Sequence, residues 1–247
     1  MGTDAHPVIE VKGRNGRWGL RDSKDGRRSS RRRREDRGED VPYDEWLAEW
    51  PDYLNELSER NYALFGVLAG VRWRSVDALF ANRGFPEDAA KATLKALDAE
   101  SHEYHSHTHF TVQELLDADW DTVCFHEKMA LFANQYLEWK DTGKLPSRLE
   151  EEQYVTGRAM WHKDLVAVHR EVTEDEMLLL LLSNTTKKLV RRRKCRLGGG
   201  YQQLGPYVAL TLPRTYRDVV QNFVDVIPSL VALGPPDQVR IVIAFDN

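Results

Sequence analysis

Short runs of mostly apolar residues lie near both ends of the chain, and these runs predict strands there. Residues 6–12 form one such segment, and the Asn15-Gly16 pair after it is a favoured two-residue hairpin turn into residues 17–20. Residues 239–245 carry a second strand pattern near the other end of the chain. Both ends are therefore expected to join one small sheet.

Helical spacing of apolar side chains dominates the chain between these strands. Residues 60–71 show it clearly, and residues 125–140 and 215–233 repeat it. A hairpin, many helices and a few short strands are typical of an α+β fold. We therefore predict one helix-rich α+β domain over residues 1–247. Its small sheet should contain the N-terminal hairpin, a histidine-bearing strand and the C-terminal strand.

Residues 101–114 hold four of the eight histidines of the chain. Three of them, His105, His107 and His109, alternate, so in an extended strand they would project from one face. A T-x-x-E capping pattern follows at once and predicts the start of a helix. A strand that delivers three imidazoles to a helix N-terminus suits a metal ion or an anion. A histidine-rich strand without a metal is the alternative.

Acidic residues and a further histidine lie in the two terminal strands. Asp4 and His6 share one face of the first strand, and Asp246 ends the last one. If these strands pair antiparallel, Asp246 lies beside Asp4 and His6. Together with His105 and His107 they would form a mixed site for a divalent ion, with Zn²⁺, Mn²⁺ or Fe²⁺ all compatible. Such an ion acts as a Lewis acid and lowers the pKa of bound water.

Basic residues concentrate in two stretches. Residues 23–40 include six arginines between positions 27 and 34 and almost nothing apolar, so we predict a mobile Arg-rich loop there. It is either a solvated insertion or a segment that binds the phosphate backbone of a nucleic acid. The second cluster, residues 187–196, contains Arg191, Arg192 and Arg193. A helix C-terminus would favour some of these cations but does not account for all of them.

Composition narrows the classes of function. The formal net charge of −4 excludes a general polyanion binder, so any nucleic-acid surface has to be local. The two cysteines lie far apart, which favours a reducing compartment. The N-terminal segment lacks the pattern of a secretory signal, and the longest apolar run, residues 177–182, is too short to span a bilayer. We expect a cytoplasmic protein with no membrane association.

Several stretches resemble a family of uncharacterised proteins from tailed bacteriophages and prophages, mostly of actinobacterial hosts. The family patterns are M-G-x-D-x-H, R-N-Y-x-L-F-x-x-L-A-G-V-R, R-G-x-P-x-D, H-S-H-S/T and V-R-I-V-x-x-F-D-N. They match residues 1–6, 60–72, 83–88, 105–108 and 239–247 in that order. The resemblance implies a phage context, and the family has no established activity.

The chain also departs from the family pattern. The Arg-rich stretch resembles an insertion, and His109 replaces the aromatic residue that usually follows the H-S-H segment, so His109 is not a shared site residue. The candidates that do lie inside the matched motifs are Asp4, His6, His105, His107 and Asp246.

The sequence leaves three functions open and does not decide whether the protein is an enzyme. The first is a phage accessory hydrolase that is metal-dependent and acts on a phosphoester or nucleotide. In it His105, His107 and Asp4 are catalytic, and Arg60 and Arg72 bind phosphate. The second is a non-enzymatic protein that binds a host protein or nucleic acid through its basic clusters, Arg191 to Arg193 included. The third is a minor virion or assembly component.

Overall fold

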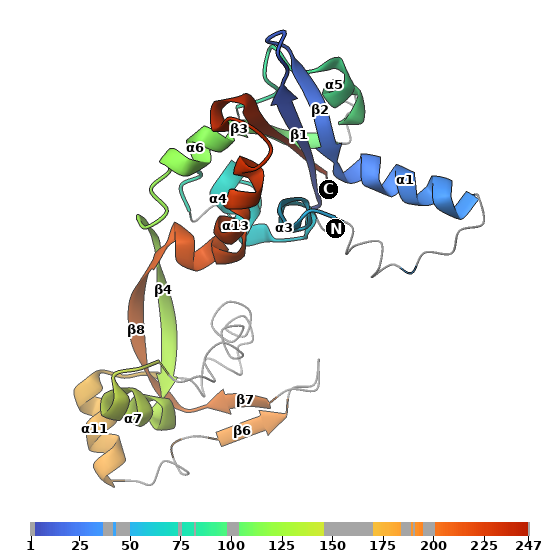
Figure 1. Cartoon of the computed structure of the whole chain (residues 1–247). Helices are drawn as coiled ribbons and strands as arrows, with labels where there is room; N and C mark the ends of the chain where they lie inside the picture. The colour runs from blue at the N-terminus through green and yellow to red at the C-terminus, as the bar shows by residue number, and fades with distance from the viewer. Residues whose placement is uncertain are drawn as a thin grey trace. The chain divides into compact units, whose positions relative to one another are not determined.

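The computed structural model describes residues 3–36, 42, 50–73, 76–81, 83–97, 104–145, 170–183, 189, 191–194 and 201–246. The chain divides into two compact units (Figure 1). Unit 1 contains Met1–Phe125 and Arg214–Asn247, and unit 2 contains His126–Pro213. The structure thus has two units where the sequence analysis expected one domain.

A four-stranded antiparallel sheet organises unit 1. Its order is β2-β1-β9-β3, with β1 at Ala5–Lys12, β2 at Trp18–Ser23, β3 at Tyr104–Thr111 and β9 at Val239–Asp246. Strands β1 and β9 pair from Ala5 opposite Phe245 to Val11 opposite Val239, so the two ends of the chain lie side by side. The α+β class and the sheet of hairpin, histidine-bearing strand and C-terminal strand are confirmed.

One face of this sheet carries the main hydrophobic core. Alternation along β1 and β9 sends Ile9, Ile241 and Phe245 to this face, where all three are fully buried. Helices α3 (Asp52–Ser58), α4 (Tyr62–Ala69) and α13 (Tyr216–Val231) pack against it (Figure 1). Burial of each such side chain stabilises the fold by about 1.5–3 kcal/mol. The apolar spacing in α4 and α13 supplies the matching helix faces.

The opposite face is covered by the segment that contains α5 (Lys91–Ala96). Val8, Val242 and Ala244 pack there against Leu97. The adjacent Glu10 is fully buried, which is sustainable because it accepts hydrogen bonds from the Ala90 N–H, Thr93 and Arg240. Both faces of the two central strands are therefore covered, as their nearly continuous apolar runs require.

Helix α1, Lys24–Asp36, replaces the irregular loop that the sequence analysis expected over residues 23–40. Ser23 Oγ accepts the Gly26 N–H at 3.0 Å and so caps the helix. The Lys24 side chain is buried and donates to the Ala5 carbonyl at 2.9 Å. Arginine is a good helix former, so a capped and anchored start is enough to order this arginine-rich segment as a helix. Residues 37–40 lie outside the described residues.

In its described residues, unit 2 combines two small sheets with two helices. β4 (Val123–Phe132), β8 (Pro206–Thr215) and β5 (Arg170–Glu171) form one sheet, and β6 (Arg191–Lys194) pairs with β7 (Tyr201–Leu204). The helices are α7 (Ala133–Thr142) and α11 (Glu174–Ser183). The helix predicted over residues 125–140 is wrong in its first half, because that part is held in the sheet beside β8. No helix among the described residues has the length and apolarity to cross a membrane.

Candidate functional site

Pairing of the first and last strands brings three predicted site residues together. His6 lies opposite Ala244, and its Nε2 is 3.1 Å from Asp246 Oδ2. The Asp4 N–H donates to Asp246 Oδ1 at 2.9 Å, and the Asp246 N–H donates to the Asp4 carbonyl at 3.1 Å. Asp4, His6 and Asp246 therefore meet at one end of the sheet, as expected if the terminal strands pair antiparallel.

Two predicted phosphate partners lie at the same end. Arg60 donates to Asp4 Oδ1 through Nε at 2.8 Å and through Nη2 at 2.7 Å. Arg72 Nε donates to the hydroxyl of Thr3, which is fully buried. Arg72 also has a positive φ of 67°, a left-handed conformation that costs a non-glycine residue energy. We call Asp4, His6, Arg60 and Asp246 the terminal cluster.

Burial and charge divide the terminal cluster into an inner and an outer part. The His6 side chain is 9% exposed, whereas those of Asp246 and Asp4 are 32% and 34% exposed. Burial acts to raise the pKa of Asp246, but hydrogen bonds from the Asp4 N–H and His6, with the charges of His6 and Lys24, outweigh it. The pKa of Asp246 is therefore lowered, and its carboxylate is ionised at neutral pH.

Three further residues support the cluster and were missed from the sequence. The ring of Tyr104 meets that of His6 edge-on, with centroids 4.8 Å apart. Tyr104 lies opposite Asp246 in the sheet, and the buried Lys24 contributes its positive charge. Thr3 is the residue that holds Arg72. Only Tyr104 carried a sequence signal, because it directly precedes the histidine stretch.

The geometry of the cluster does not present three ligands to one metal ion. No group of three or more His, Cys, Asp or Glu side chains within the described ranges is arranged to hold one. His6 Nε2 and Asp246 Oδ2 face one another at 3.1 Å, and Asp4 Oδ1 is occupied by Arg60. A divalent ion at Asp4, His6 and Asp246 would have to replace these contacts.

The histidines of β3 do not join the terminal cluster. A β-bulge lies between His105 and Thr108, where Ser106 adopts a positive φ of 53°. His105 lies opposite Phe245 and so projects to the face opposite that of His6. The expected alternation of His105, His107 and His109 is therefore broken by the bulge.

His107 and His109 have separate apolar and polar surroundings. The His107 ring packs on Phe85 with centroids 4.2 Å apart, and its buried Nε2 has no hydrogen-bond partner among the described residues. Burial lowers the pKa of His107, and the nearby His105 lowers it further. His109 Nδ1 is 3.0 Å from the Gly84 carbonyl. These rings fix the segment around residue 84 against the sheet.

The structure describes the two basic clusters only in part. Arg191, Arg192 and Arg193 belong to β6, whose backbone pairs with β7, and their side chains lie outside the described residues. In α1 the Arg27 guanidinium is held by Asp22 through two contacts of 2.9 and 2.5 Å. Arg27 is therefore partly neutralised and points back to its own sheet.

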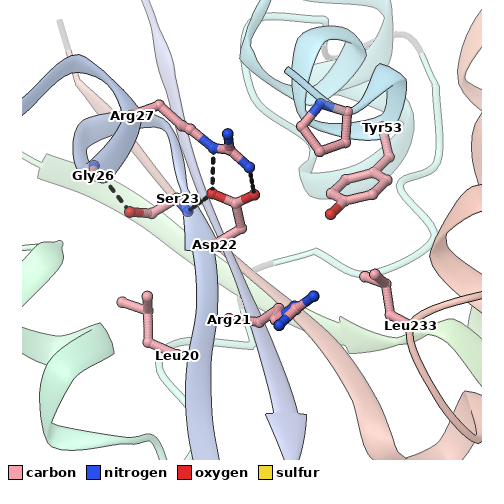
Figure 2. Close-up of a pocket in the computed structure, with 9 residues that line it drawn as sticks. Leu20, Arg21, Asp22, Ser23, Gly26, Arg27, Tyr53 and Leu233 are labelled. Atoms are coloured by element: carbon pink, nitrogen blue, oxygen red, sulfur yellow. Dashed lines mark hydrogen bonds and ion pairs between the residues drawn. The ribbon is translucent and has the colours of Figure 1, made fainter. Parts of the chain in front are cut away.

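A pocket at the edge of the sheet was not anticipated from the sequence. It has a volume of about 730 Å³ and lies beside β2, α1 and α3 (Figure 2). We call it the edge pocket, and its lining residues are Leu20, Arg21, Asp22, Ser23, Gly26, Arg27, Pro51, Tyr53 and Leu233. None of them belongs to the terminal cluster, so the hollow and the predicted acid–base residues are different places on unit 1.

No family model, curated protein or solved structure matches this chain. The resemblance to phage proteins stays a prediction from the sequence motifs. Both candidate sites therefore rest on their own geometry.

Proposed function

We propose that the protein acts on a phosphoester, such as that of a nucleotide, and that the terminal cluster is its reaction site. The supporting observation is that Asp4, His6 and Asp246 converge with Arg60 although as many as 242 positions separate them. An acid–base pair beside an exposed guanidinium supplies proton transfer and charge neutralisation, the two demands of phosphoryl chemistry.

Arg60 is assigned to the phosphate. Its Nε and Nη2 both donate to one oxygen of Asp4, whereas its Nη1 has no partner within the described part of the chain. The side chain is 54% exposed, so this remaining edge is open to solvent. Guanidinium groups bind phosphate oxygens with strong, directional hydrogen bonds. Arg72, which donates to the residue that precedes Asp4 in the sequence, supplies a second positive charge near the cluster.

The carboxylates and His6 are assigned to proton transfer. Asp246 is oriented by the Asp4 N–H, and in turn it fixes the ring of His6, as a carboxylate does in histidine-dependent catalysis. Asp4, the carboxylate partner of Arg60, is 34% exposed and is assigned to the attacking water. His105 and His107 take no part in this proposal, because His105 projects to the other face of the sheet and the His107 ring packs on Phe85.

The activity assay tests the whole proposal. Purified protein should hydrolyse at least one of p-nitrophenyl phosphate, bis-p-nitrophenyl phosphate and the nucleoside monophosphates and triphosphates. In His6→Gln the value of kcat should fall by about 100-fold or more, the usual contribution of acid–base catalysis. In Arg60→Gln the KM should rise, and Arg60→Lys should recover part of the loss.

Arg14→Gln is the matched control, because Arg14 is an exposed arginine of the hairpin turn outside the cluster. Melting curves confirm that each variant is folded. Absence of hydrolysis on every substrate, or equal activity in parent and His6→Gln, would contradict the proposal.

A metal-dependent form of the same proposal has Zn²⁺, Mn²⁺ or Fe²⁺ bound by Asp4, His6 and Asp246. It requires the ion to take the place of the His6–Asp246 contact. Elemental analysis of the untagged protein then gives near-stoichiometric metal that is lost in His6→Ala and Asp246→Asn but retained in His109→Gln. If the parent contains no metal and its melting temperature is unchanged by chelator, the metal-dependent form of the proposal is ruled out. The activity assay then tests the metal-independent form.

We further propose a phage or prophage setting in the cytoplasm of a bacterial host. The five matched motifs support it, and the terminal cluster falls within three of them.

A further inference from the structure

We propose that the edge pocket binds a small monoanionic molecule, a carboxylate or a phosphodiester, with an apolar ring or chain as its body. The pocket lies beside β2, which stands at one end of the sheet order, and its volume is about 730 Å³. Small-molecule sites commonly span about 300–1,000 Å³. The space therefore suits a ligand of roughly nucleoside or aryl-acid size.

One side of the pocket is apolar. Pro51 and Leu233 line it together with the ring of Tyr53, which is 4% exposed and otherwise packs into the core, whereas Leu20 lies apart from Tyr53 and Leu233 at the other end of the lining (Figure 2). Two separate segments supply the side chains of this wall, so it is fixed by tertiary packing and does not depend on one loop. A flat or branched apolar body would displace water from this wall on binding.

The charged side of the pocket has one cation in excess. Arg27 and Asp22 form a two-pronged ion pair, with Nε at 2.9 Å from Oδ1 and Nη2 at 2.5 Å from Oδ2, so their charges cancel. Arg21 is exposed and makes no hydrogen bond or ion pair with any other described residue. Its guanidinium projects beside Leu233 and below Tyr53 (Figure 2). Arg21 is therefore available for a planar anion.

The Tyr53 hydroxyl is a second donor for the same anion. Burial raises the pKa of Tyr53, and the carboxylate of Asp22 raises it further against the opposing charges of Arg27 and Arg21. The phenol thus stays protonated at neutral pH and can donate a hydrogen bond. The Asp22 carboxylate lies in the same lining and repels a second negative charge, which favours a monoanion.

Anilinonaphthalene sulfonate (ANS) is a suitable probe, because it joins one anionic group to an apolar ring body. Titration of the full chain, followed by fluorescence and by calorimetry, should show saturable binding to one site. N-phenylnaphthylamine keeps the rings and lacks the charge. Its affinity should be lower by a factor of about ten or more, and a factor of ten corresponds to roughly 1.4 kcal/mol. Equal binding of the two probes would overturn anion recognition at this site.

Variants locate the site. Arg21→Gln should lower the affinity for ANS about tenfold, and Arg21→Lys should restore part of it. Arg14 is a matched exposed arginine of the hairpin, so Arg14→Gln should leave the affinity unchanged. Tyr53→Phe keeps the packed ring and should cause a smaller loss. Unchanged ANS affinity in Arg21→Gln, or no saturable binding at all, would overturn the proposal.

Displacement distinguishes the two sources of the anion. Competition by 2-naphthoate identifies a carboxylate ligand, competition by the monoanionic phosphodiester cyclic AMP identifies a phosphodiester, and competition by neither contradicts the proposal. His6→Gln should bind ANS like the parent, because the edge pocket shares no lining residue with the terminal cluster. Loss of hydrolysis and loss of ANS binding are therefore independent outcomes.

Discussion

His107 shows how one buried ring makes the fold sensitive to pH. Its Nε2 is buried without a hydrogen-bond partner within the described ranges, and burial against Phe85 lowers its pKa. In the unfolded chain a histidine takes up its proton near pH 6.5, whereas in the folded protein it resists protonation to a lower pH. The unfolded state therefore binds more protons, and the folded state loses stability as the pH falls below about 6.5.

Replacement of His107 should remove this dependence. The free energy of unfolding of the parent should decrease from pH 7 to pH 5, by less than about 1.4 kcal/mol per pH unit for one proton. In His107→Leu the decrease should be smaller, and in His126→Gln, an exposed histidine of unit 2, it should match the parent. Urea denaturation at several pH values measures the free energy of unfolding. If it falls with pH by the same amount in the parent and in His107→Leu, this explanation is refuted.

At the scale of elements, one buried ion pair fastens the segment with α5 to the sheet. Glu10 is fully buried in β1 and Arg240 is almost so in β9, with Nη2 at 2.5 Å and Nε at 2.9 Å from Glu10 Oε2. Arg240 also stacks over Trp18 at 4.0 Å and contacts Asp88 at 2.6 Å. The pair thus links three strands and the segment before α5.

Loss of the buried Glu10–Arg240 pair should lower the stability of the fold strongly, whereas loss of the exposed Asp88 contact should not. Glu10→Gln removes the buried carboxylate and leaves Arg240 with the exposed Asp88 as its carboxylate partner, so the free energy of unfolding should fall by about 3 kcal/mol, the lower end of the range for a broken buried pair. Asp88 is 64% exposed in its side chain, so Asp88→Asn should cost no more than about 1 kcal/mol. Chemical denaturation compares the two, and equal losses would argue against a buried, desolvated pair.

At the scale of the whole molecule, the pattern of apolar and polar residues predicted the sheet better than it predicted the site. The apolar runs of residues 6–12 and 239–245 identified β1 and β9 because their side chains are buried on both faces. Strand pairing then placed Asp246 beside Asp4 and His6, which the spacing of polar residues had suggested. These features depend on local pattern and a single pairing, so they can be derived from the sequence.

The remaining features arise only after the chain has packed. The bulge at Ser106 follows from the register of β3 on β9 and separates the histidines that alternate in sequence. Order in α1 depends on the cap at Ser23 and the burial of Lys24, which composition alone does not reveal. The edge pocket is assembled from distant segments, as the positions of Arg21 and Leu233 show. No periodicity in the sequence encodes such a neighbourhood.

The pairing of β1 with β9 also sets the order of events during synthesis on the ribosome. Ala5 and Phe245 are partners in the sheet, so β1 has to wait until β9 has left the exit tunnel. Contacts between such distant positions slow folding, because the long intervening loop must close before they form. In the meantime the apolar side chains of β1 are exposed, so a nascent chain is prone to aggregate until β9 pairs with β1.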